Sequence, residues 1–388
     1  MPIVNRIAEF HDEMTAWRQD LHTHPELGFE EHRTSDVVAA KLESFGIEVH
    51  RGLAGTGVVG VLKSGSSGRT IGLRADMDAL PILERGEDDR PHRSVNAGVM
   101  HACGHDGHTT MLLGAAKYLA ETKNFDGTVH FIFQPAEEGK GGGDKMVQEG
   151  LFDQFPCETV FGMHNIPGIP VGSFAVSPGP MMAARDNFEI TIKGKGSHGA
   201  MPHHGIDPVL VGAHMVMALQ SITSRNLSPQ KALVLSVTQF HAGHAFNVVP
   251  DDMVLRGTCR VFDPEVQNSL PERITRIMEG VCATFGASAE LNYMKGYPAT
   301  INDPDQAEIA AVIAGRVAGD ERVDRNPTPM MGAEDFSYML NQRPGAYIWA
   351  GNGDTAGVHH PDYDFNDAGL PHGASFWAQL VEDRLKRA

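Results

Sequence analysis

Cysteine is scarce in this chain, with only four residues, Cys103, Cys157, Cys259 and Cys282, among 388. So few cysteines exclude a disulfide framework and favour a reducing compartment. Long apolar runs are also lacking, since none approaches the ~18 residues that a membrane-spanning helix needs. The N-terminal residues lack the apolar stretch of a secretory signal. We therefore expect a cytoplasmic protein with no membrane partner.

Positive charge is in short supply too. The chain has 32 lysines and arginines against 49 aspartates and glutamates, for a formal net charge of -17. Such a chain repels nucleic acid and anionic lipid surfaces, so neither is expected as a partner. Histidine, in contrast, is plentiful, with 20 residues that cluster in a few segments. A length of 388 residues predicts two or three domains.

Strand-like and helix-like segments alternate in the first 184 residues. Apolar runs bounded by glycine or proline predict strands at 57–63, 70–80, 127–135 and 159–165. Helical spacing predicts helices over the first 20 residues, over 35–46 with Thr34 or Ser35 as N-cap, and over about 109–122. This alternation is typical of an α/β domain with a largely parallel sheet. In such sheets, functional residues gather where strands end and loops begin.

The pattern changes near residue 185. Strands are predicted at 186–196, 232–243, 253–262 and 289–298, with helices at 207–224 and 266–286. The resulting β-α-β-β-α-β order is that of a ferredoxin-like α+β domain. Beyond it the chain returns to a helix at 307–317 and a glycine-rich tail. We therefore predict a discontinuous α/β domain, residues 1–184 and 299–388, that carries an inserted α+β domain, residues 185–298.

Potential metal ligands follow successive strands. Cys103 and His105 lie two residues apart in the segment MHACGHDGH, and thiolate and imidazole both suit Zn²⁺, Co²⁺ or Mn²⁺. The strand at 127–135 runs into Glu137 and Glu138, and the strand at 159–165 ends near His164. A tail loop adds two adjacent histidines, 359 and 360. Taken singly, each of these could be an ordinary surface residue.

Taken together, these residues predict a metal centre with catalytic function. Five ligands exceed what one tetrahedral zinc needs, and they suit two metal ions ~3.5–4 Å apart. Two adjacent glutamates would be costly to bury unpaired, but beside a metal they can divide the work. One glutamate can bind a cation while the other accepts a proton from water.

The order of motifs along the chain resembles the metal-dependent amidohydrolases of the M20 peptidase family. Within that family it is similar to the branch with hippurate hydrolases, N-acyl-amino-acid amidohydrolases and plant auxin-conjugate hydrolases. The motifs span residues 21–367 and read LHTHPELGFEEHRTS, LRADMDALP, MHACGHDGHTTMLLG, FQPAEEG, MHN, GKGSHGAMPHHGIDP, FNVVPD, MGAEDFSY and VHHPDYDFND. The resemblance implies a zinc-peptidase-like catalytic domain with an inserted domain that acts as lid and dimerisation module.

The resemblance also assigns roles to individual residues. It implies Glu137 as the general base, and it implies a metal-ligand set of Cys103, His105, Glu138, His164 and His359. The doubled histidine leaves His360 as an alternative to His359. The commoner pattern of the family has His-x-Asp where this chain has Asp76-Met77-Asp78, and Cys103 then supplies the missing ligand.

Further roles are implied for residues outside the ligand set. Asp78 matches an aspartate that orients a ligand beside the metals. In the inserted domain, His198 matches a lid histidine that stabilises the oxyanion, and Asn247 matches a residue that binds the substrate carboxylate. Each of the two could instead be an ordinary loop residue. Glu334 is a weaker candidate whose role the sequence leaves open.

The implied activity is hydrolysis of the amide bond of small N-acyl amino acids, with two divalent ions per subunit. Zinc, manganese, cobalt and nickel remain alternatives, because soft and hard ligands occur together. The implied assembly is a homodimer or homotetramer formed through the inserted domain, which is also expected to close over substrate. Within the family, an N-acetyl-diaminopimelate-type deacetylase or a dipeptidase or aminopeptidase is an alternative. Outside it, a hydrolase with Cys103 as nucleophile and a zinc-binding protein without turnover stay open.

Overall fold

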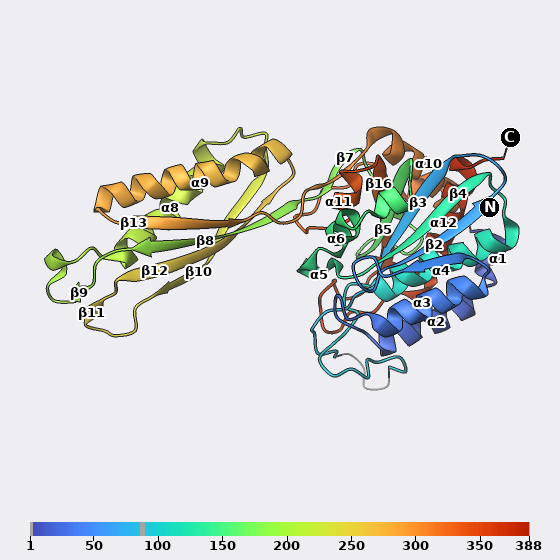
Figure 1. Ribbon diagram of the computed structural model, residues 1–388, viewed down its shortest axis with the longest axis horizontal. Helices are drawn as coiled ribbons and strands as arrows, with labels where there is room; N and C mark the ends of the chain where they lie inside the picture. The colour runs from blue at the N-terminus through green and yellow to red at the C-terminus, as the bar shows by residue number, and fades with distance from the viewer. Residues whose placement is uncertain (1–2, 86–89, 388) are drawn as a thin grey trace. The chain divides into compact units, whose positions relative to one another are not determined.

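A computed structural model of the chain describes residues 3–85 and 90–387. The chain divides into two compact units (Figure 1). The first unit comprises Met1–Met181, Ile301–Thr328 and Asp335–Ala388, and the second comprises Met182–Thr300 and Pro329–Glu334. The chain therefore leaves the first unit, builds most of the second, and returns. Together the two units have the mixed α/β and α+β architecture that the sequence predicts.

An eight-stranded sheet forms the centre of the first unit. Its strand order is β1 (Glu48–Arg51), β2 (Val58–Ser64), β4 (Gly127–Gln134), β3 (Thr70–Asp76), β5 (Thr159–Pro167), β16 (Gly345–Gly353), β6 (Phe174–Ala175) and β15 (Val323–Asp324). The central strands β4, β3, β5 and β16 run parallel. The pairs β1–β2, β2–β4 and β16–β6 are antiparallel, so the prediction of a largely parallel sheet is right only for the centre.

Helices cover this sheet. Nearly every residue of β3, β5 and β16 is buried, which indicates that both faces of the central strands are covered. Helices α4 and α12 pack against each other and against β3, while α6 packs on β4. The helices of this unit are α1 (Asn5–Ala8), α2 (His11–Thr23), α3 (His32–Ser44), α4 (His105–Thr122), α5 (Glu137–Lys140), α6 (Gly142–Gln148), α7 (Leu151–Gln154), α10 (Pro304–Ala318), α11 (Ser337–Leu340) and α12 (Leu370–Arg384), with 3₁₀ turns at Asp320–Arg322 and Asp367–Gly369.

Several helices begin elsewhere than predicted. The first 20 residues form two helices, α1 and α2, rather than one. Helix α3 begins at His32, three residues early, because the Glu26 carboxylate accepts hydrogen bonds from the backbone N–H groups of Arg33 (3.0 Å) and Thr34 (2.8 Å). An acceptor from outside the helix therefore replaces the expected Thr34 or Ser35 cap.

Helix α4 begins at His105 and not near 109, because Gly104 adopts a left-handed conformation with φ of 91°. A Cβ at Gly104 would lie 2.2 Å from Nδ2 of Asn165, so only glycine fits. His105 is therefore part of the first helical turn. This start places it directly beside the carboxyl ends of β3 and β5.

The second unit is a four-stranded antiparallel sheet with two helices on one face (Figure 1). Its strand order is β10 (Leu233–Ala242), β12 (Asp252–Val261), β8 (Ala184–Lys193) and β13 (Ser288–Met294), and its helices are α8 (Pro208–Arg225) and α9 (Pro264–Phe285). This is the β-α-β-β-α-β order of a ferredoxin-like fold, and the fold class predicted from the sequence is confirmed. Alternating buried positions of β8 and β12 face the helices, while their other faces carry polar residues.

Short elements complete the structure. In the second unit β9 (Ser197–His198) pairs with β11 (Val248–Val249), next to a 3₁₀ turn at Pro202–His204. Strands β7 (Gly179–Met182) and β14 (Thr300–Asn302) occupy the segments where the chain passes between the units. Within the described residues, no helix combines the length and apolarity needed to cross a membrane.

Candidate metal centre

Cys103, His105 and His164 converge in the first unit. The Sγ of Cys103 lies 3.3 Å from Nε2 of His164, and one ligand atom of each of the three lies within 4.8 Å of the others. All three side chains are buried. Cys103 lies just before α4, His105 is the first residue of α4, and His164 comes from β5, so the fold joins residues 61 positions apart.

Glu138 and His359 complete the cluster. Nε2 of His359 lies 3.1 Å from Oε1 of Glu138, and both are within 4.8 Å of the Cys103 thiol. Cys103 therefore belongs to two triplets of potential ligands. The alternative tail histidine, His360, turns its Nδ1 to Asp362 at 3.6 Å, although both histidines are exposed. Of the two adjacent histidines, only His359 lies in the cluster, and its φ of 66° holds it there in a left-handed conformation.

Hydrogen bonds orient the two buried imidazoles. Nδ1 of His105 donates to the backbone oxygen of Asp78 at 2.8 Å and lies 3.2 Å from its Oδ1. Nδ1 of His164 donates to the backbone oxygen of Asn165 at 2.6 Å. When each ring is neutral, as a metal ligand must be, Nε2 is therefore the atom that carries the free lone pair. Asp78 also accepts from the backbone N–H of Glu138 at 2.9 Å, as its predicted orienting role requires.

The cluster fits divalent metal ions. Nε2 of His105 is buried and makes no hydrogen bond of normal geometry within the described residues, which is costly unless something binds it. Thiolate, imidazole and carboxylate together suit Zn²⁺ and its neighbours in the first transition series. The two triplets that share Cys103 match a pair of ions better than a single one.

Glu137 lies beside this cluster without belonging to either triplet. Its carboxylate groups with His105 and Glu138 within 4.8 Å, and its side chain is buried. The preceding residue, Ala136, has a left-handed conformation with φ of 54°, which turns the chain sharply after β4. One carboxylate is therefore available as a base next to the ligand carboxylate.

Sequence reasoning missed a buried polar network beneath the centre. Asp76 lies 2.6 Å from Nδ1 of His108 and 2.7 Å from Arg74, and Nε2 of His108 accepts from the backbone N–H of Asn165 at 2.9 Å. Asp335 in turn accepts from Arg74 at 3.0 Å. The signal was present as Asp76 two residues before Asp78, because alternate strand residues point the same way. Asp335, 261 residues from Arg74, gave no such signal.

Charges around the centre shift the titration of the predicted ligands. Burial raises the pKa of the Cys103 thiol, and the Glu138 carboxylate adds to this effect. Burial opposes the charge of His105, but Asp76 and Cys103 outweigh it and hold its pKa well above the usual value. Burial and the neighbouring histidines lower the pKa of His164. Hydrogen bonds with Cys103 and Glu138 raise the pKa of His359 to about 10.

These shifts argue against a cysteine hydrolase. A nucleophilic cysteine needs a lowered pKa and access to substrate. Cys103 has a raised pKa, and the residue is only 7% exposed. The thiol is therefore better suited to lose its proton to a metal than to attack an amide.

A second buried charge cluster lies between α2 and the first turn of α4. Nδ1 of His22 is 2.8 Å from Asp106, its Nε2 is 3.4 Å from Glu84, and Arg18 lies 3.6 Å from Asp106. Burial opposes the charge of His22, but its hydrogen bonds with Asp106 and Glu84 outweigh it and raise its pKa to about 9. His101 nearby is also buried, and burial lowers its pKa to about 4. His22 is thus a buried cation, whereas His101 is neutral.

We expect His22 to make folding pH-dependent. A raised pKa stabilises the folded state fully below about pH 6.5, and this contribution is lost as pH rises through about 9. The shift corresponds to about 3 kcal/mol of unfolding free energy at most. The free energy of unfolding of metal-free protein, measured with denaturant between pH 6 and 9, should therefore depend less on pH in His22→Gln than in wild type. His32→Gln, at an exposed position, is the control, and equal slopes for both variants would contradict the assignment.

The two predicted residues of the second unit lie next to each other within it. His198 on β9 pairs with Val248, the neighbour of Asn247, and the backbone N–H of Gly199 donates to the Asn247 oxygen at 2.7 Å. Both residues line an exposed pocket of about 470 Å³. Nδ1 of His198 accepts from the backbone N–H of Ala200 at 3.0 Å, so in the neutral ring Nε2 carries the hydrogen. The side chain is thereby prepared to donate.

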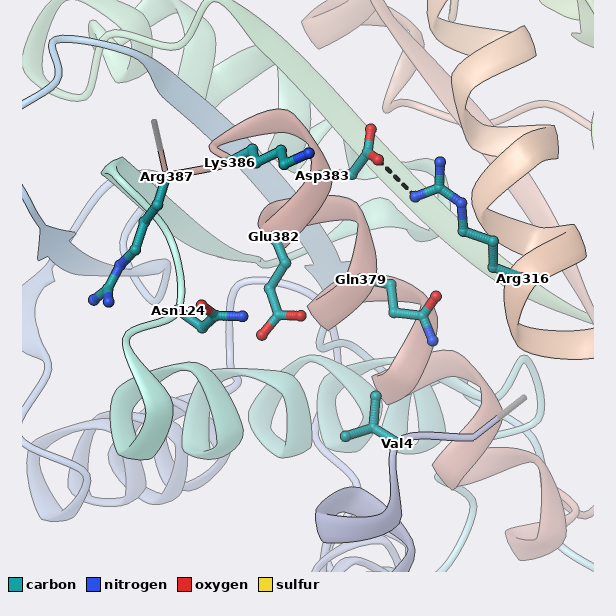
Figure 2. Close-up of a pocket in the computed structure, with 8 residues that line it drawn as sticks. All are labelled: Val4, Asn124, Arg316, Gln379, Glu382, Asp383, Lys386 and Arg387. Atoms are coloured by element: carbon teal, nitrogen blue, oxygen red, sulfur yellow. Dashed lines mark hydrogen bonds and ion pairs between the residues drawn. The ribbon is translucent and has the colours of Figure 1, made fainter. Parts of the chain in front are cut away.

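A separate surface pocket of about 530 Å³ contains none of the predicted site residues (Figure 2). Arg316 and Asp383 face each other across it at 2.6 Å, and Glu382 accepts from the Tyr118 hydroxyl at 3.1 Å. It is lined by Val4, Asn124, Arg316, Gln379, Glu382, Asp383, Lys386 and Arg387. None of its charged lining residues belongs to a group of potential metal ligands in the part of the chain that the structure describes.

The fold and the cluster define a class of protein, namely two-unit α/β proteins with a cluster of potential metal ligands at the carboxyl ends of parallel central strands. Residues 72–383 match the family model described as peptidase family M20/M25/M40. The chain therefore belongs to this family.

Similar proteins support this assignment. The chain is 41% identical over 386 residues to hippurate hydrolase of Campylobacter jejuni, covering 100% of both chains. It is 39% identical to N-acetylcysteine deacetylase of Bacillus subtilis, covering 96% of this chain and 97% of that one. Among solved structures, the YXEP protein of Bacillus subtilis, described as a dinuclear metal binding peptidase from the M20 family, superposes with a TM-score of 0.86. It is 35% identical, with 98% of this chain and 100% of that chain covered.

Proposed function

We propose that this protein is a metal-dependent amidohydrolase that cleaves the amide bond of N-acyl amino acids to a free amino acid and a carboxylic acid. The observation that carries the proposal is the pair of triplets around Cys103 with a second carboxylate, Glu137, beside them. A purely structural metal site needs no such base. Relatives named for hippurate, N-acetylcysteine and auxin-conjugate hydrolysis support the substrate class.

The residues that would hold the metal ions are Cys103, His105, Glu138, His164 and His359. When bound, the ions would act as Lewis acids and would lower the pKa of a bound water toward neutral pH. Glu137 accepts a proton from the water that attacks the amide carbonyl. It later donates this proton to the leaving amine as the C–N bond breaks, which gives a carboxylic acid and a free amino acid. Asp78 keeps His105 and the Glu138 backbone in place throughout.

The proposal is tested by measuring amino acid release from a panel of N-acyl amino acids. The panel contains N-benzoyl-glycine, several N-acetyl amino acids including N-acetyl-diaminopimelate, and dipeptides. Each is assayed with Mn²⁺, Zn²⁺, Co²⁺ or Ni²⁺ and again after EDTA. We expect release from acyl amino acids that EDTA abolishes and that a divalent ion restores. Release from dipeptides alone would support the peptidase alternative, and release that survives EDTA would contradict a metal-dependent mechanism.

We also propose that the second unit is a lid whose His198 stabilises the oxyanion and whose Asn247 binds the substrate carboxylate. The prepared Nε2–H of His198 supports this role, because an oxyanion needs a donor that is already oriented. His198→Ala is expected to lower kcat by about 10²-fold or more while metal content stays unchanged. The neighbouring exposed His203→Ala serves as control, and equal kcat values for the two variants would remove His198 from the mechanism.

Assembly and location are part of the proposal as well. The exposed side chains of Val209, Leu210 and Met217 on α8 support a homodimer or homotetramer formed through the second unit. All four cysteines are free thiols, which supports a reducing, cytoplasmic location. The proposed substrate is a small molecule. The negative net charge of the protein argues against nucleic acid or an anionic membrane as partner.

A further inference from the structure

The motif LHTHPELGFEEHRTS has no role in the proposed reaction, yet its last glutamate contacts the turn at residues 136–138, which carries Glu137 and Glu138. Glu31 is fully buried. Its Oε1 accepts from the backbone N–H of Ala136 at 2.8 Å, and its Oε2 accepts from the Thr56 hydroxyl at 2.6 Å. Ala136 directly precedes Glu137. A loop more than 100 residues earlier in the sequence therefore binds the peptide that introduces the predicted base.

The position of Glu31 in its own helix makes this contact informative. Glu31 is the N-cap residue of α3, where a carboxylate would ordinarily accept from the free N–H groups of its helix. Its side chain makes no such cap bond. Glu26 instead accepts from the backbone N–H groups of Arg33 and Thr34. Helix α3 is thus capped without the Glu31 carboxylate, which accepts from the Ala136 N–H and the Thr56 hydroxyl.

Ala136 needs such a restraint because its backbone is strained. Its φ of 54° and ψ of 44° place a residue with a Cβ in the left-handed region, which glycine occupies freely and alanine does not. A strained conformation persists only where the surroundings fix it. The backbone N–H of Ala136 is fixed by Glu31, and its C=O accepts from the N–H of Gly142 at 3.0 Å.

The same loop also fills the space against this turn. A Cβ at Gly28 would lie 3.0 Å from both Cα and Cβ of Ala136, so the two backbones are in close contact. The Gly28 oxygen accepts from Nζ of Lys140, on the far side of the turn, at 2.7 Å. The turn that carries Glu137 and Glu138 is therefore held from below by residues 28–31.

We propose that Glu31 is a positioning residue that fixes the direction of Glu137 by holding Ala136 in its left-handed conformation. Glu31 lies outside the ligand clusters and acts only through the Ala136 peptide. The inference rests on the proposed role of Glu137 as base. A displacement of about 1 Å at a reacting group can cost about 10²-fold in rate, so the effect should be large.

Four variants of the full-length protein separate length from charge at position 31. Glu31→Gln keeps the length and one carbonyl acceptor for the Ala136 N–H, and the Thr56 hydroxyl can rotate to accept from the new amide. Glu31→Asp keeps the charge but is one carbon too short to reach the Ala136 N–H. Glu31→Ala removes the group altogether. Glu30→Ala, at the exposed neighbouring position, is the matched control.

At saturating Mn²⁺ with N-acyl amino acid substrate, we expect Glu31→Ala and Glu31→Asp to lower kcat by about 10²-fold with KM changed less than about threefold. Glu31→Gln should stay within about threefold of wild type, and Glu30→Ala should be unchanged. If Glu31→Ala does not fold, the comparison of Gln with Asp still decides the matter. A Gln variant as slow as the Asp variant, or Ala and Asp variants as fast as the control, would overturn the proposal.

A second readout does not depend on turnover. Amide hydrogen exchange of the segment 134–140 in metal-free protein is expected to be at least ~10-fold faster in Glu31→Ala and Glu31→Asp than in wild type and Glu31→Gln, because the Ala136 N–H loses its partner. Equal exchange in all variants would overturn the proposal even if rates differ. If wild type hydrolyses no substrate while exchange follows the expected order, the proposed function fails and the restraint of Ala136 stands.

Discussion

Replacing Glu137 with glutamine is expected to lower kcat by about 10³-fold, because an amide of the same shape cannot accept the proton of the attacking water. The residue is buried beside His105 and Glu138 but belongs to neither triplet around Cys103. Metal content should therefore equal that of wild type, as measured by elemental analysis after desalting. The loss should appear in kcat and leave KM nearly unchanged.

The adjacent glutamate provides the matched comparison. Glu138→Gln removes a carboxylate that lies 3.1 Å from His359 and within 4.8 Å of Cys103. We expect this variant to lose metal affinity first and activity as a consequence, with partial recovery at high metal concentration. Wild-type turnover in Glu137→Gln would show that Glu137 is not the base. Loss of metal from this variant would show that Glu137 is a ligand.

Metal affinity is expected to rise steeply with pH. In the metal-free protein the pKa of the Cys103 thiol is raised, the pKa of His105 is well above its usual value, and the pKa of His359 is about 10, so all three groups carry a proton at pH 7. A metal ion binds only the thiolate and neutral imidazoles, so binding releases these protons. Each released proton changes the apparent affinity about tenfold per pH unit, which gives about 100-fold or more per unit between pH 6 and 8.

Competition with a chelator of known affinity measures this slope directly. His164, whose pKa is lowered by burial, is already neutral and should add nothing to it. His359→Ala is expected to lower the slope by about one proton, whereas Glu137→Gln should leave it unchanged. A metal affinity independent of pH in this range would show that the predicted thiol and imidazole are not ligands.

The sequence predicted the architecture and the residues of the cluster because both follow from local patterns. Strand–helix alternation indicated the α/β unit, and the order of strands and helices after residue 185 indicated the ferredoxin-like unit. Glu138 and His164 lie at the ends of recognisable strands, while Cys103 and His105 lie in a glycine-flanked segment before a predicted helix. The structure brings these four and His359 together, and it separates His359 from His360.

Features that depend on distant contacts were not predictable in this way. Strand β16 has glycine at both ends and asparagine within it, so its pattern resembles a loop until β5 pairs with it. The early start of α3 depends on the Glu26 side chain, and that of α4 on Gly104 beside Asn165. Glu31 and Asp335 are buried acids, and their hydrogen bonds with Ala136 and Arg74 span 105 and 261 residues. No local window contains both members of such a pair.

The positions of the predicted ligands along the chain have a further consequence. Four of them precede the segment that builds the second unit, and His359 follows it. Metal ions held by this set would join the two ends of a chain segment of nearly 200 residues, as a cross-link does. The C-terminal part of the first unit would then stay bound to its N-terminal part even if the second unit unfolds. The ions would then stabilise the fold of a discontinuous unit in addition to their part in the reaction, because they would close a long loop of the chain.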